Sequence, residues 1–209
     1  MTTNLYQSFK NSDDIIKTVL TNCIKMLTAR KLLKEENLDK NTADIINKIN
    51  IDLIFNVPMD KFTSEIDKIL IVKIISQKVT SVSKTSNIND FLTMYKNSPK
   101  IIIAIDISKK AIQLITTNFP KTEVFLEEEF MINIIDNELV PKHELLSPEE
   151  EKEFYESYGC KKKNVPKIYS IDPIIRYYNM PIGSICKITR PSKTSGFVPF
   201  YRLVIKGTY

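Results

Sequence analysis

The segment that decides the fold of the first two thirds of the chain is KIIIAIDISKKA, residues 100–111. Apolar side chains run from Ile101 to Ala104 without alternation, which is typical of a strand buried on both faces of a sheet. Asp106 ends this run, and Ser108 is a good N-cap for a helix that begins directly after it. The segment therefore predicts a buried strand that turns into a helix, as in a layered α/β domain.

Further strands are predicted on both sides of this segment. Residues 69–75 are rich in β-branched side chains, which favour strands. Two more short strands are predicted at residues 122–126 and 131–135. Between residues 41 and 62 the pattern is weaker, and Pro58 is expected to interrupt it.

Helices are predicted between these strands. The first begins near Ser12, presents one apolar stripe and is expected to run to about Leu33. A second follows the polar residues 85–87. The helix after Ser108 is expected to bury three residues on one side, namely Ala111, Leu114 and Ile115. Because strands and helices alternate, residues 1–138 are predicted to form one α/β domain with a mixed or parallel sheet.

The last third of the chain begins with a strong helix start. Ser147 is an N-cap, Pro148 stands at the first helical position, where its missing N–H costs nothing, and Glu150 completes a capping box. Gly159 is expected to end this helix, because glycine adopts the left-handed conformation at low cost.

A shorter helix and two strands follow. Asp172 and Pro173 repeat the cap and the proline for a helix that is expected to end near Asn179. Two strands and the loop between them are predicted next, at residues 184–190, 200–206 and 191–196. We therefore predict that residues 139–209 form a small α+β domain with its own core.

Composition limits the function without deciding it. The net charge of +5 favours contact with a polyanion. Four glycines leave no Gly-rich phosphate loop, and the single histidine, His143, has no acid–base partner at a recognisable spacing. Three widely spaced cysteines, Cys23, Cys160 and Cys186, form no CxxC pair, so neither a zinc site nor a disulfide framework is predicted. We expect no cofactor, no metal and no small-molecule ligand.

The sequence is predicted to belong to a soluble intracellular protein. Its N-terminus lacks the layout of a signal peptide, and no apolar run is long enough to span a bilayer. The reducing interior of a cell also suits three unpaired cysteines.

One enzymatic alternative rests on Asp106, an acid at a strand end that is followed by Lys109. Metal-dependent nucleases need paired carboxylates for a divalent ion and a lysine beside the phosphate. The Glu-x-Lys tripeptide of such sites occurs only at residues 150–152, on a surface helix of the other domain. The adjacent acids at residues 127–129 cannot all face one site if they lie in a strand. A stand-alone nuclease, or a DNA-binding protein derived from one, is therefore the weaker reading.

A more specific pattern runs through the last third of the chain. Its motifs are ELVPKHELL (138–146), SPEEE (147–151), VPKI (165–168), DPIIRYY (172–178), KITRPSKTSG (187–196) and YRLV (201–204). In this order and with little insertion, they resemble the fifth subunit shared by the eukaryotic nuclear RNA polymerases, a family that has a short archaeal counterpart. The resemblance is strong over residues 138–206 and looser before them.

The resemblance implies a non-catalytic subunit of a multisubunit DNA-directed RNA polymerase. In this family the C-terminal assembly domain binds mainly to the largest polymerase subunit and also adjoins other polymerase subunits. The N-terminal jaw domain lies beside downstream double-stranded DNA and has a nuclease-like fold without catalytic groups. An adaptor that uses the C-terminal module to dock on a polymerase transiently is a further alternative.

The looser match of the N-terminal part, together with the bias toward Lys, Ile and Asn, suggests a large DNA virus that encodes its own polymerase. Such a source implies viral transcription in the host cytoplasm or the virion. A divergent protist is the other reading, and it implies the nucleus.

Ser108, Lys109 and Lys110 are the predicted DNA contact. A helix N-terminus presents unpaired N–H groups to a phosphate, and the two lysines add positive charge. The alternative interpretation is that Lys109 and Lys110 form a solvated first turn of the helix that binds nothing, because the same sequence fits both.

Ten residues of the assembly domain are predicted to serve the subunit interface or the architecture of the domain: Pro166, Asp172, Pro173, Gly183, Arg190, Ser192, Thr194, Gly196, Tyr201 and Arg202. Arg190, Tyr201 and Arg202 are the preferred interface residues, because arginine and aromatic side chains anchor buried interfaces. The prolines restrict the backbone, and the two glycines are expected to supply turns with positive φ.

Overall fold

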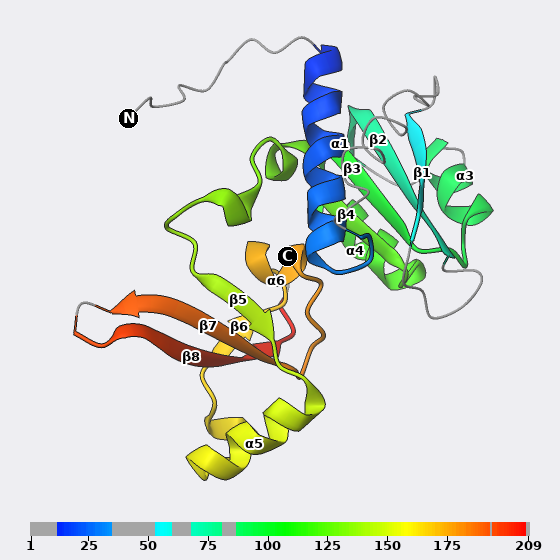
Figure 1. Cartoon of the computed structure of the whole chain (residues 1–209). Coiled ribbons are helices and arrows are strands. Elements are labelled where there is room, and N and C mark those ends of the chain that lie inside the picture. The colour runs from blue at the N-terminus through cyan, green and yellow to red at the C-terminus, as the bar shows by residue number, and fades with distance from the viewer. Residues whose placement is uncertain (1–11, 35–52, 60–67, 81–86, 193, 208–209) are drawn as a thin grey trace, which may run out of the picture. The chain divides into compact units, whose positions relative to one another are not determined.

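The computed structural model describes residues 12–34, 53–59, 68–80, 87–192 and 194–207. Two compact units divide the chain, Met1–Asn133 and Ile134–Tyr209, and each is built around a four-stranded sheet (Figure 1). The sequence prediction places the division a few residues later, between residues 138 and 139. In the described ranges, no helix has both the length and the apolar character that crossing a membrane requires.

The sheet of the first unit has the strand order β1-β2-β3-β4. Its strands are β1 (Ile54–Pro58), β2 (Ile69–Val79), β3 (Lys100–Ile107) and β4 (Thr122–Leu126). β1 runs antiparallel to β2, whereas β2, β3 and β4 are parallel, so the predicted mixed sheet is confirmed. β3 lies in the middle, and Ile101–Ala104 are completely buried, as their unbroken apolar run predicts.

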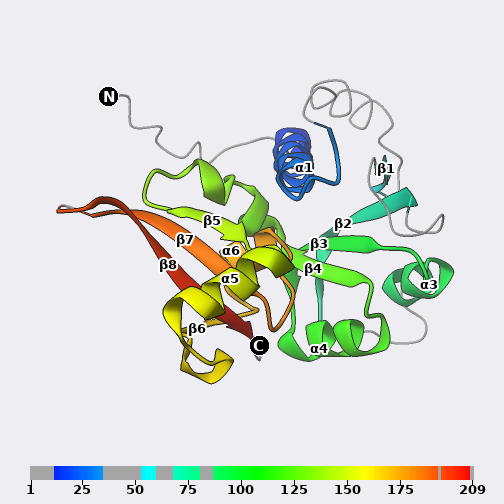
Figure 2. The same cartoon turned by 60° about the horizontal axis from the view of Figure 1, so that its bottom comes forward.

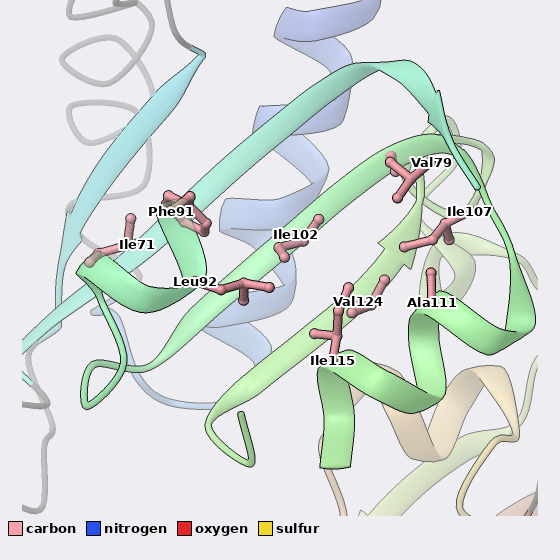
Figure 3. Packing of buried hydrophobic residues seen from close by; sticks show 10 residues of the cluster. Ile71, Val79, Phe91, Leu92, Ile102, Ile107, Ala111, Ile115 and Val124 are labelled. Carbon is pink, nitrogen blue, oxygen red and sulfur yellow. The ribbon is translucent and has the colours of Figure 1, made fainter. Parts of the chain in front are cut away.

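Helices cover both faces of this sheet, as Figure 2 shows. They are α3 (Asn87–Met94) and α4 (Lys109–Asn118) on one face and α1 (Ser12–Ala29) on the other. Leu92 of α3 and Ile115 of α4 pack with Ile102 of β3 in one buried cluster (Figure 3). Complete burial of one such side chain contributes about 1.5–3 kcal/mol. The packing of α3 and α4 on β3 therefore contributes substantially to the stability of the first unit.

One charged side chain lies within this core. Lys100 is 1 % exposed, and its ammonium donates to the carbonyl oxygens of Tyr95 at 2.6 Å and Ser98 at 3.1 Å, just after α3. Burial, and to a smaller extent the nearby Lys121, lowers the pKa of Lys100. The two carbonyl oxygens that follow α3 therefore supply the hydrogen bonds that a buried ammonium group needs.

α1 ends earlier than predicted, at Ala29 and not near Leu33. Lys31 adopts a positive φ of 60°, and the N–H of Leu32 donates to the carbonyl of Leu27 at 3.1 Å. This is the Schellman arrangement, in which glycine usually occupies the position that Lys31 holds here. No residue type marks this end as a helix stop, because lysine is a good helix former.

Two polar contacts, one from α1 and one from the residue that follows it, join this part of the chain to the rest of its unit. The buried side chain of Asn22 donates to the carbonyl of Phe130 at 2.7 Å. The Arg30 guanidinium forms a bidentate salt bridge with Glu123 of β4, with both N–O distances at 2.8 Å. Only 5 % of the Arg30 side chain is exposed.

No strand forms at residues 131–135, so that prediction is wrong. After β4 the chain makes two short 3-10 turns, η3 (Glu127–Phe130) and η4 (Ile134–Asp136). The Glu129 carboxylate accepts a hydrogen bond from the N–H of Leu126 at 2.7 Å and so bends the chain directly after the strand.

α4 buries a slightly different stripe from the predicted one. Ala111 and Ile115 are 1 % exposed, as expected, but Leu114 is 50 % exposed. Ile112 and Phe119 complete the buried side instead. The buried side of α4 is therefore centred on Ala111 and Ile115 and includes Ile112, whereas Leu114 lies at its border.

The sheet of the second unit has the strand order β5-β7-β8-β6. Its strands are β5 (Lys142–Leu145), β6 (Lys167–Tyr169), β7 (Ile185–Ser192) and β8 (Gly196–Ile205). β7 is antiparallel to both β5 and β8, whereas β6 is parallel to β8. The β7–β8 hairpin is longer than predicted, since pairing continues to Ser192 and Gly196, inside the predicted loop.

Two helices cover opposite faces of this sheet. They are α5 (Pro148–Tyr158) and α6 (Pro173–Tyr177). Ile185 of β7 packs with Phe154 of α5, whereas its neighbour Cys186 packs with Ile175 of α6. Successive residues of β7 thus serve two separate core clusters, which is the period-two pattern of a strand. The unit is α+β, as predicted.

The predicted caps of these helices are present. The Ser147 hydroxyl accepts from the N–H of Glu150 at 3.3 Å, and the Glu150 carboxylate accepts from the N–H of Ser147 at 2.7 Å. Gly159 ends α5 with a φ of 55°. The Asp172 carboxylate accepts from the N–H of Ile174 at 3.0 Å and caps α6, which is shorter than predicted.

One glutamate also joins α5 to the sheet. The Glu151 carboxylate accepts a hydrogen bond from the N–H of Ile185 at 2.7 Å. The β5–β7 pairing ends at Leu145 and Cys186, so Ile185 lies one residue beyond it. The carboxylate therefore takes the place of a strand carbonyl at the start of β7.

Candidate nucleic-acid and subunit interfaces

The predicted DNA contact lies where β3 passes into α4. The Ser108 hydroxyl accepts from the N–H of Ala111 at 3.2 Å and donates to the carbonyl of Thr80 at 2.7 Å, which ties this turn to the chain after β2. Lys109 and Lys110 occupy the first two helical positions and are exposed. The first N–H groups of a helix have no partners within it. The turn therefore combines amide donors with two ammonium groups, and we call residues 108–110 the α4 turn.

A third lysine lies at the same end of the sheet, where β2 and β3 finish. Lys78 of β2 is paired in register with Asp106 of β3, and its ammonium lies 2.6 Å from the carboxylate. The hydrogen bond to Asp106 raises the pKa of Lys78. Asp106, on which the nuclease alternative depends, is thus engaged with a lysine. In the part of the chain that the structure describes, no group of three or more His, Cys, Asp or Glu side chains is arranged to hold a metal ion.

The far part of the β7–β8 hairpin extends beyond both helices of its unit (Figures 1 and 2). We call its exposed residues the hairpin end: Arg190, Pro191, Thr194, Ser195, Gly196, Phe197, Pro199 and Phe200. Phe197 is 76 % exposed and Phe200 is 38 % exposed. Large aromatic side chains thus remain in water where the helices no longer cover the sheet.

The two faces of the hairpin end differ in chemistry. The Arg190 guanidinium lies over the Phe200 ring, 3.6 Å from its centroid, and Arg202 belongs to the same face. Phe197 lies on the opposite face, paired in register with Pro191. One face is therefore cationic and aromatic, and the other is apolar.

Tyr201, a preferred interface residue, is half-buried against α5. Its ring centroid lies 4.6 Å from that of Phe154 and 5.6 Å from that of Tyr158. Burial raises the pKa of Tyr201. Tyr201 therefore contributes to the packing of its own unit, and Tyr158, which is 60 % exposed, forms the open border of this aromatic group.

Three other predicted residues shape the backbone around β6 and α6. The carbonyl of Pro166 accepts from the N–H of Leu203 at 2.7 Å and starts the pairing of β6 with β8. Asp172 caps α6, and Pro173 occupies its first position. Each of these residues has a local role in building the unit.

The two predicted glycines adopt positive φ, as expected. Gly183 has a φ of 93°, and its N–H donates to the carbonyl of Val204 at 2.8 Å. A Cβ atom at this position would also lie 3.3 Å from the ammonium nitrogen of Lys162. Gly196 has a φ of 70° at the start of β8 and no atom close to its Cβ position. At residue 196 only the backbone conformation favours glycine. At residue 183 the conformation favours glycine, and a side chain would also lie close to Lys162.

The structure groups the predicted residues unequally. Six lie on the hairpin: Arg190, Ser192, Thr194, Gly196, Tyr201 and Arg202. The hydroxyls of Ser192 and Thr194 are 3.5 Å apart. The sequence reasoning missed Phe197 and Phe200, because it ended the loop at residue 196 and began the strand at 200. The apolar run FVPFY at residues 197–201, which includes three aromatic residues, was the available signal for a longer strand.

Comparison with known proteins gives concordant matches. Residues 132–204 match the family model described as RNA polymerase Rpb5, C-terminal domain. The chain is 32% identical to DNA-directed RNA polymerase subunit 5 of Acanthamoeba polyphaga mimivirus over 207 residues, which cover 97% of this chain and 98% of that protein.

Shorter matches reach cellular proteins. The chain is 39% identical over 107 residues to subunit RPABC1 of DNA-directed RNA polymerases I, II and III of Caenorhabditis elegans, covering 50% of this chain and 51% of that protein. It is 43% identical over 83 residues to the subunit of the same name in Dictyostelium discoideum, covering 40% of this chain and 42% of that protein.

Proposed function

The chain belongs to the RNA polymerase Rpb5 family, and from that premise we propose how its two units serve the enzyme. It acts in transcription as a non-catalytic subunit of a multisubunit DNA-directed RNA polymerase. We propose that the second unit is the assembly domain, which docks on the largest subunit. The first unit is then the jaw, a nuclease-like α/β domain beside the downstream DNA duplex.

The hairpin end is the surface that we propose for docking. Its main support is Phe197, whose side chain is 76 % exposed in the free chain. When a partner removes an exposed ring of this size from water, the free energy of the complex is lowered. Arg190 stacked on Phe200 adds a preorganised cationic and aromatic group. Aromatic residues and arginine are the types that dominate the centres of protein interfaces.

Alanine substitutions in a tagged subunit test this docking. We expect Phe197→Ala and Arg190→Ala each to weaken recovery of the largest subunit, by about 2 kcal/mol or roughly thirty-fold in affinity if they are hot spots. Leu139→Ala is the matched control, because Leu139 is 89 % exposed in the same unit but lies outside the hairpin. Unchanged co-purification of folded Phe197→Ala and Arg190→Ala variants would refute the docking surface.

The α4 turn is the surface that we propose for downstream DNA. Its amide donors and the ammonium groups of Lys109 and Lys110 suit a phosphate. Contacts of this kind position a duplex without reading its bases, so they should depend on salt and not on sequence.

A photoreactive amino acid tests this contact in the assembled polymerase on a DNA template. Placed at Lys110, it should crosslink to the downstream duplex, and the yield should fall as salt is raised. Thr117 is the matched position, because it is exposed at the other end of the same helix. Equal crosslinking from both positions, or none from Lys110, would remove the α4 turn from the DNA path.

A further inference from the structure

Charge is divided unevenly along the second unit. α5 carries five glutamates and one lysine, whereas residues 157–209 contain ten Lys or Arg residues and a single acid, Asp172. The Asp172 carboxylate already accepts a hydrogen bond as the cap of α6. The part of the unit that follows α5 is therefore strongly cationic, and little negative charge within it offsets this.

Five of these cations gather where η5 (Lys162–Asn164) leads into β6, the strand at one edge of the sheet. They are Lys161, Lys162, Lys163, Lys167 and Arg202, all of them exposed, and we call them the β6 edge. The Arg202 guanidinium lies 3.5 Å from the carbonyl of Lys167. Two ion pairs of the same unit join lysines outside this group, Lys142 with Glu144 and Lys152 with Glu156.

We propose that the β6 edge binds the phosphate backbone of a nucleic-acid duplex. The cores of protein interfaces are depleted in lysine and enriched in aromatic residues and arginine. The hairpin end has that composition, whereas four of the five residues of the β6 edge are lysines. Lysine is a point charge on a flexible stem, and it suits phosphates that are held without fixed geometry. One unit therefore presents two surfaces of different chemistry.

Protection of a sheet edge explains only part of this pattern. A lysine on an edge strand discourages pairing with a strand of another molecule. That reason applies to Lys167, which lies in β6, but not to residues 161–163, which precede the strand. Lys162 and Lys163 are successive residues of a 3-10 turn, which has three residues per turn, so they point in different directions, and Lys161 precedes them in an extended conformation. They therefore widen the cationic surface instead of guarding one strand.

The proposal rests on membership of a polymerase family, whose enzymes hold a duplex, and not on the hairpin end or the α4 turn. The full chain is titrated with a short fluorescein-labelled DNA duplex, and binding is followed by fluorescence anisotropy at several salt concentrations. The test variant combines Lys161→Gln, Lys163→Gln and Lys167→Gln. Lys162 and Arg202 are left in place, because they lie close to Gly183 and to the carbonyl of Lys167.

We expect the test variant to bind the duplex at least about ten-fold more weakly at low salt. The slope of log affinity against log salt should fall by about 0.9 for each phosphate that the variant no longer neutralises, so by up to about 2.7. A control variant combines Lys142→Gln, Lys152→Gln and Lys187→Gln, which removes the same charge from the same unit outside the β6 edge. It should keep most of the affinity and the slope.

Two results would overturn the proposal. One is an affinity and a salt slope of the test variant equal to those of the control variant. The other is competition by poly-glutamate as effective as that by unlabelled duplex at equal charge, which would assign the β6 edge to an acidic protein surface. A parallel variant with Lys109→Gln and Lys110→Gln measures the contribution of the α4 turn separately.

Discussion

The two units differ in how far they bury the apolar side chains of their central strands. In the first unit, Ile101–Ala104 of β3 are fully buried between helices on both faces of the sheet. In the second unit, β8 is buried at Leu203 and Val204 but exposed at Phe197 and Phe200. The same kind of side chain thus stabilises the fold in one unit and remains available to a partner in the other. Substitutions should separate these two uses.

The largest contrast is expected between Ile102 and Phe197. Ile102→Ala leaves a cavity in a fully buried layer and should lower the free energy of unfolding by about 4 kcal/mol. Phe197→Ala should change it by no more than about 0.5 kcal/mol, because the ring is exposed. Chemical denaturation followed by circular dichroism measures both changes. Similar losses for the two variants would mean that the hairpin end belongs to the core.

A second contrast compares two ion pairs. Arg30→Met removes the partner of Glu123 from a pair whose arginine side chain is 5 % exposed and whose glutamate is 29 % exposed. Breaking a buried pair costs about 3–5 kcal/mol, and the partial exposure of Glu123 favours the lower end of that range. Lys142→Met breaks the exposed pair with Glu144 in the second unit and should change the stability far less, because water and salt screen exposed charges.

Amide hydrogen exchange shows which of the two units each substitution destabilises. Arg30→Met should speed exchange in β4, whereas Lys142→Met should leave both sheets protected. A loss of protection confined to β5 and β7 in the Arg30→Met variant would contradict the assignment of the pair to the first unit.

The smallest effect concerns the caps. Ser147→Ala removes the hydroxyl that accepts from the N–H of Glu150 and should destabilise the second unit by about 1 kcal/mol. Ser147→Thr keeps the acceptor and should have a smaller effect. Thermal melting of the two variants measures the difference. If Ser147→Thr loses as much stability as Ser147→Ala, the capping bond is not the cause.

The sequence predicted best the elements that local chemistry determines. β3, α4 and β4 were expected because a β-branched apolar run, a serine cap and a proline break lie within one short segment. The capping box of α5 was equally visible, since all its atoms come from residues 147–150. In such segments, each residue favours the structure that the neighbouring residues also require.

The missed elements depend on distant partners. β1, β5 and β6 are short strands of five, four and three residues, and pairing with β2, β7 and β8 determines them. The false strand at residues 131–135 has the opposite cause, because its apolar side chains suggested a strand while Glu129 bends the chain before it. The early end of α1 also lacked a signal, since Lys31 occupies a position that glycine usually marks.

The candidate surfaces were predictable only in part. Arginine and tyrosine at residues 190, 201 and 202 carry a residue-type signal that a sequence shows. Tyr201 and Arg202 alternate along β8, but whether Arg190 shares the face of Arg202 depends on the register of β7 and β8, which pairs Arg190 with Val198 and Pro191 with Phe197. A shift of one residue in that register would exchange the faces. The sequence does not contain this information locally.

The hydrogen bond between Glu151 and the first residue of β7 makes a helix side chain part of a strand ladder. Loss of α5 would leave a main-chain donor buried without an acceptor at the base of the long hairpin. Helix and hairpin should therefore fold and melt as one cooperative piece, and an isolated β7–β8 peptide should not keep its shape. The Glu151 carboxylate therefore stabilises the β7–β8 hairpin at the end opposite to its exposed turn.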